Sequence, residues 1–305
     1  IANQSVNEDS GLNFTVASDA FNDVDSGDSL TYTATLADGS SLPSWLSFNA
    51  STRSFTGTPL NDNVGDINVK VTATDGSSVA VSDDFTLTIN NTNDAPTVSN
   101  AIANQSVNED SGLNFTVASD AFNDVDSGDS LTYTATLADG SDLPSWLSFN
   151  TSTRVFSGTP LNDNVGDISV KVTATDGSSV AVSDDFTLTI NNTNDAPTVS
   201  NAIANQSVNE DSGLNFTVAS DAFNDVDSGD SLTYTATLAD GSALPSWLSF
   251  NTSTRSFTGT PLNDNVGDIS VKVTATDGSS TTVSDNFTLT INNTNDAPTG
   301  VSLSA

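Results

Sequence analysis

The 305-residue chain contains no cysteine, no histidine and no methionine. The first two absences exclude disulfides, thiolate nucleophiles and imidazole bases, and remove the usual ligands of zinc and copper. Positive charge is also scarce, because six Lys and Arg stand against 39 Asp and Glu, a formal net charge of −33. Such a chain repels phosphate backbones and anionic headgroups, so we expect no nucleic-acid partner and no membrane insertion. Divalent cations are the partners that such a negative chain favours. For the acids that are scattered along the chain, an alternative explanation is adaptation of a solvated surface to saline water.

The sequence that is present repeats itself three times. The segment that opens at Ile1 with Ile-Ala-Asn-Gln-Ser-Val-Asn-Glu-Asp returns at Ile102 and at Ile203, a period of 101 residues. That period is too long for a solenoid unit and matches one β-sandwich domain. The copies differ mainly by small or polar exchanges, such as Ser41, Asp142 and Ala243 at one position. Near-identical tandem repeats are more typical of a spacer than of a catalytic site.

Apolar and polar residues alternate strictly in Leu12–Val16, Leu30–Leu36, Ile67–Ala73 and Phe85–Ile89. A period of two places one face of a strand on a core and the other in water. Turn signals separate these segments, so each unit should have about seven strands. The predicted fold class is therefore all-β: three tandem immunoglobulin/cadherin-like Greek-key β-sandwiches in an extended linear array. The expected domains are residues 1–96, 97–197 and 198–298, and residues 299–305 would begin a further repeat or form a tail of a longer array.

Two residues of the unit allow a functional interpretation that we do not favour. Trp45 could stack on a sugar, but it lies in the apolar run Leu42–Phe48 and a core position is expected. Lys70 could form an isopeptide cross-link if it were buried. Its neighbours Val69 and Val71 take the inward positions of the strand, so Lys70 should point outward.

Acidic residues gather in four loops of each unit. In the first unit these are Asn7–Asp9, Asn22–Asp28, Thr74–Gly76 and Asn90–Pro96. Asp and Asn also stabilise turns through their own backbone, which suffices for an isolated pair such as Asp38-Gly39. Four acidic loops with almost no basic residues to compensate them favour a metal. Calcium takes six to eight oxygen ligands from carboxylates, amides and carbonyls, and these loops offer all three.

These loops also resemble a known family. Asp23-Val-Asp-Ser-Gly-Asp-Ser-Leu-Thr-Tyr32 resembles the cadherin D-x-D loop, Val71–Gly76 its A-x-D-G element, and Asn91–Pro96 its linker. Leu42–Phe48, with Phe55-Thr-Gly-Thr-Pro59, is similar to the dystroglycan-type cadherin-like repeats, also described as immunoglobulin-like repeats of bacterial surface proteins. The resemblance covers nearly all of each repeat.

The resemblance implies a calcium cluster at each junction between repeats. Its ligands at the first junction would be Glu8, Asn93, Asp94, Asp124, Asp126 and Asp176. At the second junction they would be Glu109, Asn194, Asp195, Asp225, Asp227 and Asp277. The clusters around Asp23 and Asp296 should each be half a site. Because Leu60–Asn63 replaces the cadherin D-R-E motif and the linker opens with Asn91, we expect one or two ions per junction, with Asp62 a further candidate ligand.

The sequence therefore predicts calcium-binding extender repeats of a large secreted or surface-exposed bacterial adhesin, stiffened by Ca2+ at the junctions. Calcium and the neighbouring repeats are the expected partners, other domains could contact polysaccharide or a cell surface, and the chain should be a monomer. The alternative is a calcium-dependent carbohydrate-binding or homophilic adhesion module. Catalysis is not expected, because general acid chemistry needs a sheltered carboxyl group and these acids lie in end loops.

Overall fold

The computed structural model describes residues 1–297 and 300, apart from residues 26, 28, 127 and 228. Asp28 of the second acidic loop and most of the expected tail therefore lie outside the described residues. The protein is all-β, as predicted, and is built from three repeats of about one hundred residues. In the described part, no helix is both long enough and apolar enough to cross a membrane.

The first repeat contains the seven strands that its pattern predicts. They are β1 (Gln4–Asn7), β2 (Leu12–Thr15), β3 (Thr31–Leu36), β4 (Leu46–Asn49), β5 (Ser54–Gly57), β6 (Gly65–Thr74) and β7 (Ala80–Asn90), with a short 3-10 turn η1 (Asn61–Asn63) before β6. One sheet has the order β1-β7-β6-β3 and the other has the order β2-β5-β4. The strand β1 runs parallel to β7, whereas β6 and β7 form a long antiparallel hairpin.

The core of the first repeat lies between these two sheets. Four inward residues of β6 and β7, Val69, Val71, Leu87 and Ile89, are fully buried at no more than 1% exposure. Phe55 stacks with Phe14 of its own sheet, and it meets Phe85 of the opposite sheet edge-on, with ring centroids 5.7 Å apart. Burying such side chains is the main favourable contribution to folding. The alternation in the sequence thus forms the core that it predicts.

The two residues with competing interpretations have structural roles. Trp45 packs against this core but remains half-buried. Lys70 donates a 2.7 Å hydrogen bond from Nζ to the Ala37 carbonyl and is half-buried on the outer face of β6. Packing requires glycine at position 57, because a Cβ there would lie 2.0 Å from the Trp45 carbonyl oxygen. These contacts give Trp45, Lys70 and Gly57 structural roles in the repeat.

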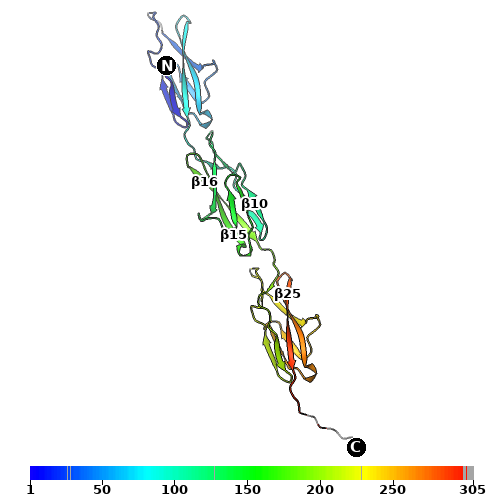
Figure 1. Ribbon diagram of the computed structural model, residues 1–305. Helices are drawn as coiled ribbons and strands as arrows, with labels where there is room; N and C mark the ends of the chain where they lie inside the picture. The colour runs from blue at the N-terminus through cyan, green and yellow to red at the C-terminus, as the bar shows by residue number, and fades with distance from the viewer. Residues whose placement is uncertain (26, 28, 127, 228, 298–299, 301–305) are drawn as a thin grey trace. The chain divides into compact units, whose positions relative to one another are not determined.

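The second and third repeats copy this arrangement and add two short strands each (Figure 1). The second contains β8 (Thr97–Val98), β9 (Gln105–Asn108), β10 (Leu113–Thr116), β11 (Phe122–Asn123), β12 (Thr132–Leu137), β13 (Leu147–Asn150), β14 (Val155–Gly158), η2 (Asn162–Asn164), β15 (Gly166–Thr175) and β16 (Ala181–Asn191). The third contains β17 (Thr198–Val199), β18 (Gln206–Asn209), β19 (Leu214–Thr217), β20 (Phe223–Asn224), β21 (Thr233–Leu238), β22 (Leu248–Asn251), β23 (Ser256–Gly259), η3 (Asn263–Asn265), β24 (Gly267–Thr276) and β25 (Thr282–Asn292).

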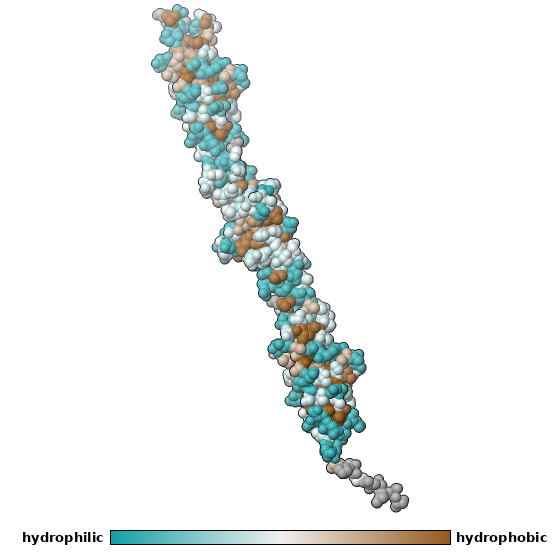
Figure 2. Space-filling model, viewed as in Figure 1, coloured by the Kyte–Doolittle hydropathy of each residue, from teal (hydrophilic) through white to brown (hydrophobic). Residues whose placement is uncertain are grey.

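The chain forms two compact units whose boundary falls inside the second repeat. Residues 1–104, 114–157 and 169–187 form one unit, and residues 105–113, 158–168 and 188–305 form the other. The linker after the first repeat lies in the first unit together with the loops it contacts, and the linker after the second repeat lies in the second unit. The residues of each junction therefore belong to a single unit. The visible face of the chain is largely hydrophilic, with apolar residues in small separate patches (Figure 2).

Candidate metal sites at the repeat junctions

The parallel pairing of β1 with β7 places a glutamate at the start of the linker. Asn7 pairs with Asn90 at the end of both strands, and the next residue, Glu8, donates its backbone N–H to the Asn90 carbonyl at 3.0 Å. The Glu8 side chain turns inward and is only 2% exposed. Its Oε1 accepts a 2.6 Å hydrogen bond from the Thr92 backbone N–H. The carboxylate thus fixes the path along which the chain leaves the first repeat.

The linker then reaches the D-x-D loop of the second repeat. The backbone N–H of Asp94 donates to Asp126 Oδ2 at 2.8 Å, and the Asp94 carboxylate accepts a hydrogen bond from the Asn61 side-chain amide at 2.5 Å. Asp126 is 6% exposed. Its own loop is held by the Asp126 N–H, which donates to Asp124 Oδ1 at 3.0 Å. Residues from both repeats and the linker therefore converge here.

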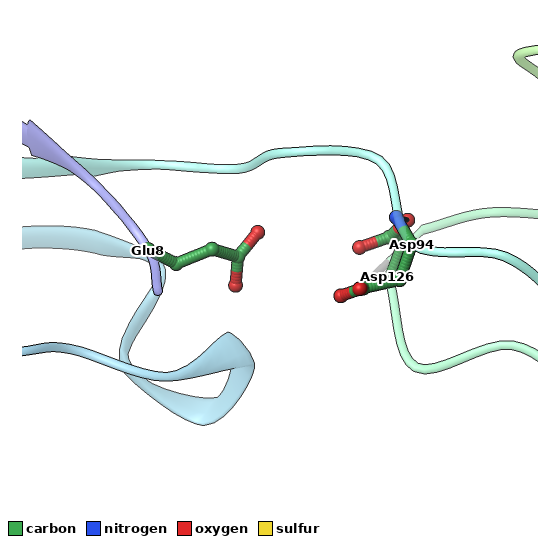
Figure 3. A group of neighbouring side chains, drawn as sticks. All are labelled: Glu8, Asp94 and Asp126. Atoms are coloured by element: carbon green, nitrogen blue, oxygen red, sulfur yellow. Dashed lines mark hydrogen bonds between the residues drawn. The ribbon is translucent and has the colours of Figure 1, made fainter. Parts of the chain in front are cut away.

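One carboxylate oxygen each from Glu8, Asp94 and Asp126 lies within 4.8 Å of the others (Figure 3). The equivalent residues Glu109, Asp195 and Asp227 form the same group at the second junction. Two like charges at 4.8 Å repel by about 3 kcal/mol at an effective dielectric constant near 20. Across the described residues, the one ion pair joins the Ile1 amino group to Asp83, so neither Lys nor Arg offsets this repulsion.

Several of these carboxylate oxygens are buried and accept no hydrogen bond from the described residues. Within the part of the chain that the structure describes, hydrogen-bond partners are lacking for Glu8 Oε2, Asp124 Oδ2 and Asp126 Oδ1. At the second junction the same holds for Glu109 Oε2, Asp225 Oδ2 and Asp227 Oδ1. A buried carboxylate oxygen without a partner is costly, and buried charges are normally paired or coordinate a metal. Equivalent oxygens lack hydrogen-bond partners at both junctions, which is typical of the ligands of a metal ion.

A third acidic loop joins each group through an asparagine. Asn93 donates from Nδ2 to Asp176 Oδ2 at 3.0 Å, and Asn194 donates to Asp277 Oδ2 at 3.1 Å. Asp176 and Asp277 are each 5% exposed. The hydrogen bond from Asn93 is the main reason why the pKa of Asp176 lies below its ordinary value. Burial raises the pKa of Asp277, but the hydrogen bonds from Asn194 and the Thr281 backbone outweigh it. Both carboxylates are therefore ionised at neutral pH.

The twelve residues that the sequence proposes all lie at the two junctions. Each is hydrogen-bonded to another member of its set or has a carboxylate oxygen within 4.8 Å of one. Sequence reasoning missed two further contributors. Asn61 and its counterpart Asn162 donate to the linker carboxylates Asp94 and Asp195, whereas Asp62, the candidate from the same loop, is exposed. Asp129 lies within 4.8 Å of Asp124 and Asp126, and Asp230 lies equally close to Asp225 and Asp277. Asn61 belongs to the segment that departs from the cadherin motif, and Asp129 is the last acid of the D-x-D loop.

The donor set suits a hard cation. Carboxylate oxygens predominate, linker amides and carbonyls adjoin them, and the chain has neither thiolate nor imidazole. Calcium accepts such oxygens in a flexible arrangement, whereas zinc and copper prefer nitrogen and sulfur. The residues present therefore fit Ca2+ better than a transition metal.

Comparison with known proteins agrees with the fold. The family described as Putative Ig domain matches residues 1–90, 95–191 and 196–292, which is most of the chain. The chain belongs to this family. No curated protein sequence matches this Ig-domain chain.

Solved structures similar to these Ig domains include cadherin ectodomains. Mouse cadherin-23 domains 22–24 share 18% identity, with 96% of each chain covered and a TM-score of 0.56. Protocadherin gamma B2 domains 1–5 share 18% identity over 88% of this chain and 53% of that chain, with a TM-score of 0.59. An endo-fucoidan hydrolase of glycoside hydrolase family 107 is 22% identical over 86% of this chain and 39% of that one, but its TM-score of 0.31 carries no argument. At these identities the cadherin likeness shows a cadherin-like fold. The chain spans about half or less of the length of several matched structures.

Proposed function

We propose that this chain is a set of extracellular stalk repeats that Ca2+ stiffens at the junctions. The observation that carries the proposal is the pair of buried, orphaned carboxylate groups, Glu8 with Asp126 and Glu109 with Asp227. Calcium at each group would be held by the six residues proposed for that junction, with Asp129 or Asp230 and the linker carbonyls nearby. The ion supplies positive charge and fixes the three loops that meet there.

Stiffening follows from where the ligands lie. Each set takes Glu8 or Glu109 from one repeat, two residues from the linker, and three aspartates from the next repeat. Without calcium these carboxylates repel one another, which favours arrangements that separate them. With calcium, one ion holds all three segments and the neighbouring repeats adopt one arrangement. A spacer that displays another domain at a distance needs this property.

The cadherin-like fold and Ig-domain repetition support a secreted or surface location, and we propose a bacterial adhesin or surface protein as the parent, with domains near residues 1–96, 97–197 and 198–298. We assign no catalytic role to the repeats. Calcium is the proposed ligand, and the neighbouring repeats are the proposed partners.

Small-angle scattering in calcium and in chelator tests the stalk. We expect the maximum dimension in calcium to be well defined and the Kratky plot to lose the rise typical of connected mobile domains. Sodium chloride matched for ionic strength is the control, because it screens exposed charges without bridging them. Identical profiles in calcium and chelator would rule out metal-dependent stiffening.

A further inference from the structure

Each repeat has a single arginine, and it occupies the same strained position in all three. Arg53, Arg154 and Arg255 end the turns between β4 and β5, β13 and β14, and β22 and β23. Their φ angles are +57°, +58° and +56°. This left-handed conformation suits glycine and is unfavourable for a residue with a side chain. A strained residue that recurs in every copy indicates that its side chain has a role.

The arginine side chain is held against a tyrosine. Cζ of Arg154 lies 5.4 Å from the centroid of the Tyr133 ring, and the equivalent distance is 5.6 Å in both other repeats. Arg154 and Tyr133 are both half-buried, and Arg154 Nε donates a 3.4 Å hydrogen bond to the Val117 carbonyl. Stacking occupies the face of a guanidinium and leaves the N–H groups at its edge available. The group is therefore fixed in place with its outer edge free.

The outer nitrogens of this guanidinium have no acidic partner. The described residues include every acidic residue except Asp28, and the one ion pair among them joins the Ile1 amino group to Asp83. Within the same residues, the Nε hydrogen bond to Val117 is the one that the Arg154 side chain donates. A planar guanidinium fork matches a carboxylate with two parallel hydrogen bonds. In a chain with 39 acidic residues, this arginine thus remains available for a carboxylate from elsewhere.

Arg154 borders an open hollow in the surface of the second repeat. The hollow has a volume of about 530 Å³ and lies between β12 and the turn that joins β13 to β14. Tyr133, Thr134, Thr151 and Ser152 line it together with Arg154. Among the described residues, the hydroxyl groups of Thr134, Thr151 and Ser152 form no hydrogen bond with the protein. Small-molecule sites commonly have volumes of about 300–1,000 Å³, so the hollow is large enough for a sugar residue.

The lining indicates the chemistry of a ligand. The guanidinium edge suits a carboxylate, and the three hydroxyl groups can both donate to and accept from the hydroxyls of a sugar. A lipid would need an apolar lining, which these hydroxyls do not provide. A long polyanion would be repelled by the net charge of −33, whereas one isolated carboxylate is repelled much less. A uronic acid residue combines one carboxylate with several hydroxyls.

We propose that the hollow beside Arg154 binds a carboxylated sugar of the uronic acid class, with its carboxylate on the guanidinium and its hydroxyls on Thr134, Thr151 and Ser152. The other repeats have the same residues at these positions, except that Ala50 replaces Thr151 in the first repeat. None of these residues belongs to the junction sets, so the site needs no calcium and is independent of the stalk proposal. Repetition of the site multiplies a weak contact along the chain.

NMR titration of the full chain tests this site, because three arginine Nε–H signals are easily resolved. The probe is methyl β-D-glucuronide, added after calcium has been removed on a chelating resin. We expect a saturable shift of the Arg154 signal with a Kd on the order of 1 mM, and about threefold weaker binding at Arg53, which Ala50→Thr should restore. Methyl β-D-glucoside lacks the carboxylate and should shift no arginine signal. A glucuronide titration without a saturable Arg154 shift would overturn the site.

Three further measurements identify what is bound. Acetate carries the carboxylate alone and should bind at least about tenfold more weakly than the glucuronide. Methyl glucoside 6-sulfate replaces the planar carboxylate by a tetrahedral anion and should also bind more weakly. Equal binding of acetate would overturn the sugar, and equal binding of the sulfate would overturn the preference for a carboxylate. Restoring calcium should leave the Kd unchanged, and binding that appears only with calcium would place the ligand at the junctions instead.

Variants of the arginine complete the test. Arg154→Gly suits the φ angle of +58°, so the chain should fold normally, lose the glucuronide shift at the Thr134 amide and keep the shifts at Arg53 and Arg255. Arg154→Lys keeps the charge without the planar fork and should weaken binding about tenfold. Lys171→Gln removes the other positive charge of the same repeat and should have no effect, because Lys171 lies outside the hollow. A Thr134 shift that survives Arg154→Gly would show that Arg154 does not hold the ligand.

Discussion

We expect calcium to raise the melting temperature of the chain by about 10–20 °C when its concentration is a hundredfold above the dissociation constant. Binding to the folded state alone adds about 2.7 kcal/mol under that condition, and about 1 kcal/mol shifts the melting temperature of a hundred-residue domain by about 4–8 °C. The gain is large because the folded chain holds carboxylates that no described residue neutralises, whereas the unfolded chain can separate them. Thermal unfolding followed by circular dichroism, with calcium varied against excess chelator, measures it.

Two controls separate binding from screening. Sodium chloride at equal ionic strength weakens repulsion between exposed acids but cannot bridge buried ones, so its effect should be small. Magnesium should stabilise less than calcium, because it demands stricter octahedral geometry and gives up its water reluctantly. If sodium chloride raised the melting temperature as much as calcium does, the junction acids would be an ordinary acidic surface.

We expect Glu109→Gln to change the stability of the chain in opposite directions with and without calcium. The substitution removes one charged ligand, so calcium affinity at the second junction should fall about a hundredfold, equivalent to about 2.7 kcal/mol. In chelator the same variant should be more stable than the natural chain by about 1–3 kcal/mol, because Glu109 is 1% exposed with one oxygen unpartnered within the described residues. Gln retains an oxygen that can accept the hydrogen bond from the Thr193 N–H. Calorimetric titration and chemical denaturation give the two numbers.

The third repeat offers a matched control for this variant. Glu210 is also 1% exposed and accepts the equivalent hydrogen bond, from the Thr294 N–H at 2.6 Å. Among the described residues, however, Glu210 belongs to no group of three neighbouring carboxylates. Glu210→Gln should therefore stabilise the chain in chelator and leave the calcium isotherm unchanged. Asp142→Asn, at an exposed position that is Ser41 and Ala243 in the other repeats, should change neither. A Glu109→Gln variant that behaved like Glu210→Gln would remove Glu109 from the metal site.

Local patterns in the sequence predict the strands well because the packing is simple. The buried residues of β6 and β7 alternate with Thr, Asn, Lys or Asp, so the period of two is visible without a structure. The same regularity places Trp45 against the core and Lys70 on the outer face.

The junction residues could be proposed only through a resemblance, because their proximity depends on three loops far apart in sequence. Where the motif departs from cadherins, the sequence does not decide which side chain of Leu60–Asn63 faces the linker. Asp62 carries a carboxylate, which is a stronger calcium ligand than an amide. However, the 3-10 turn η1 directs Asn61 toward the linker and leaves Asp62 exposed to solvent.

A crystal structure grown in calcium tests the central claim most directly, through an anomalous difference map that distinguishes the ion from water. The account predicts a peak with oxygen ligands at about 2.3–2.6 Å that include Glu8 Oε2 and Asp126 Oδ1, and a second peak at Glu109 and Asp227. Peaks at neither junction, with Asp94 and Asp126 still in contact, would contradict it.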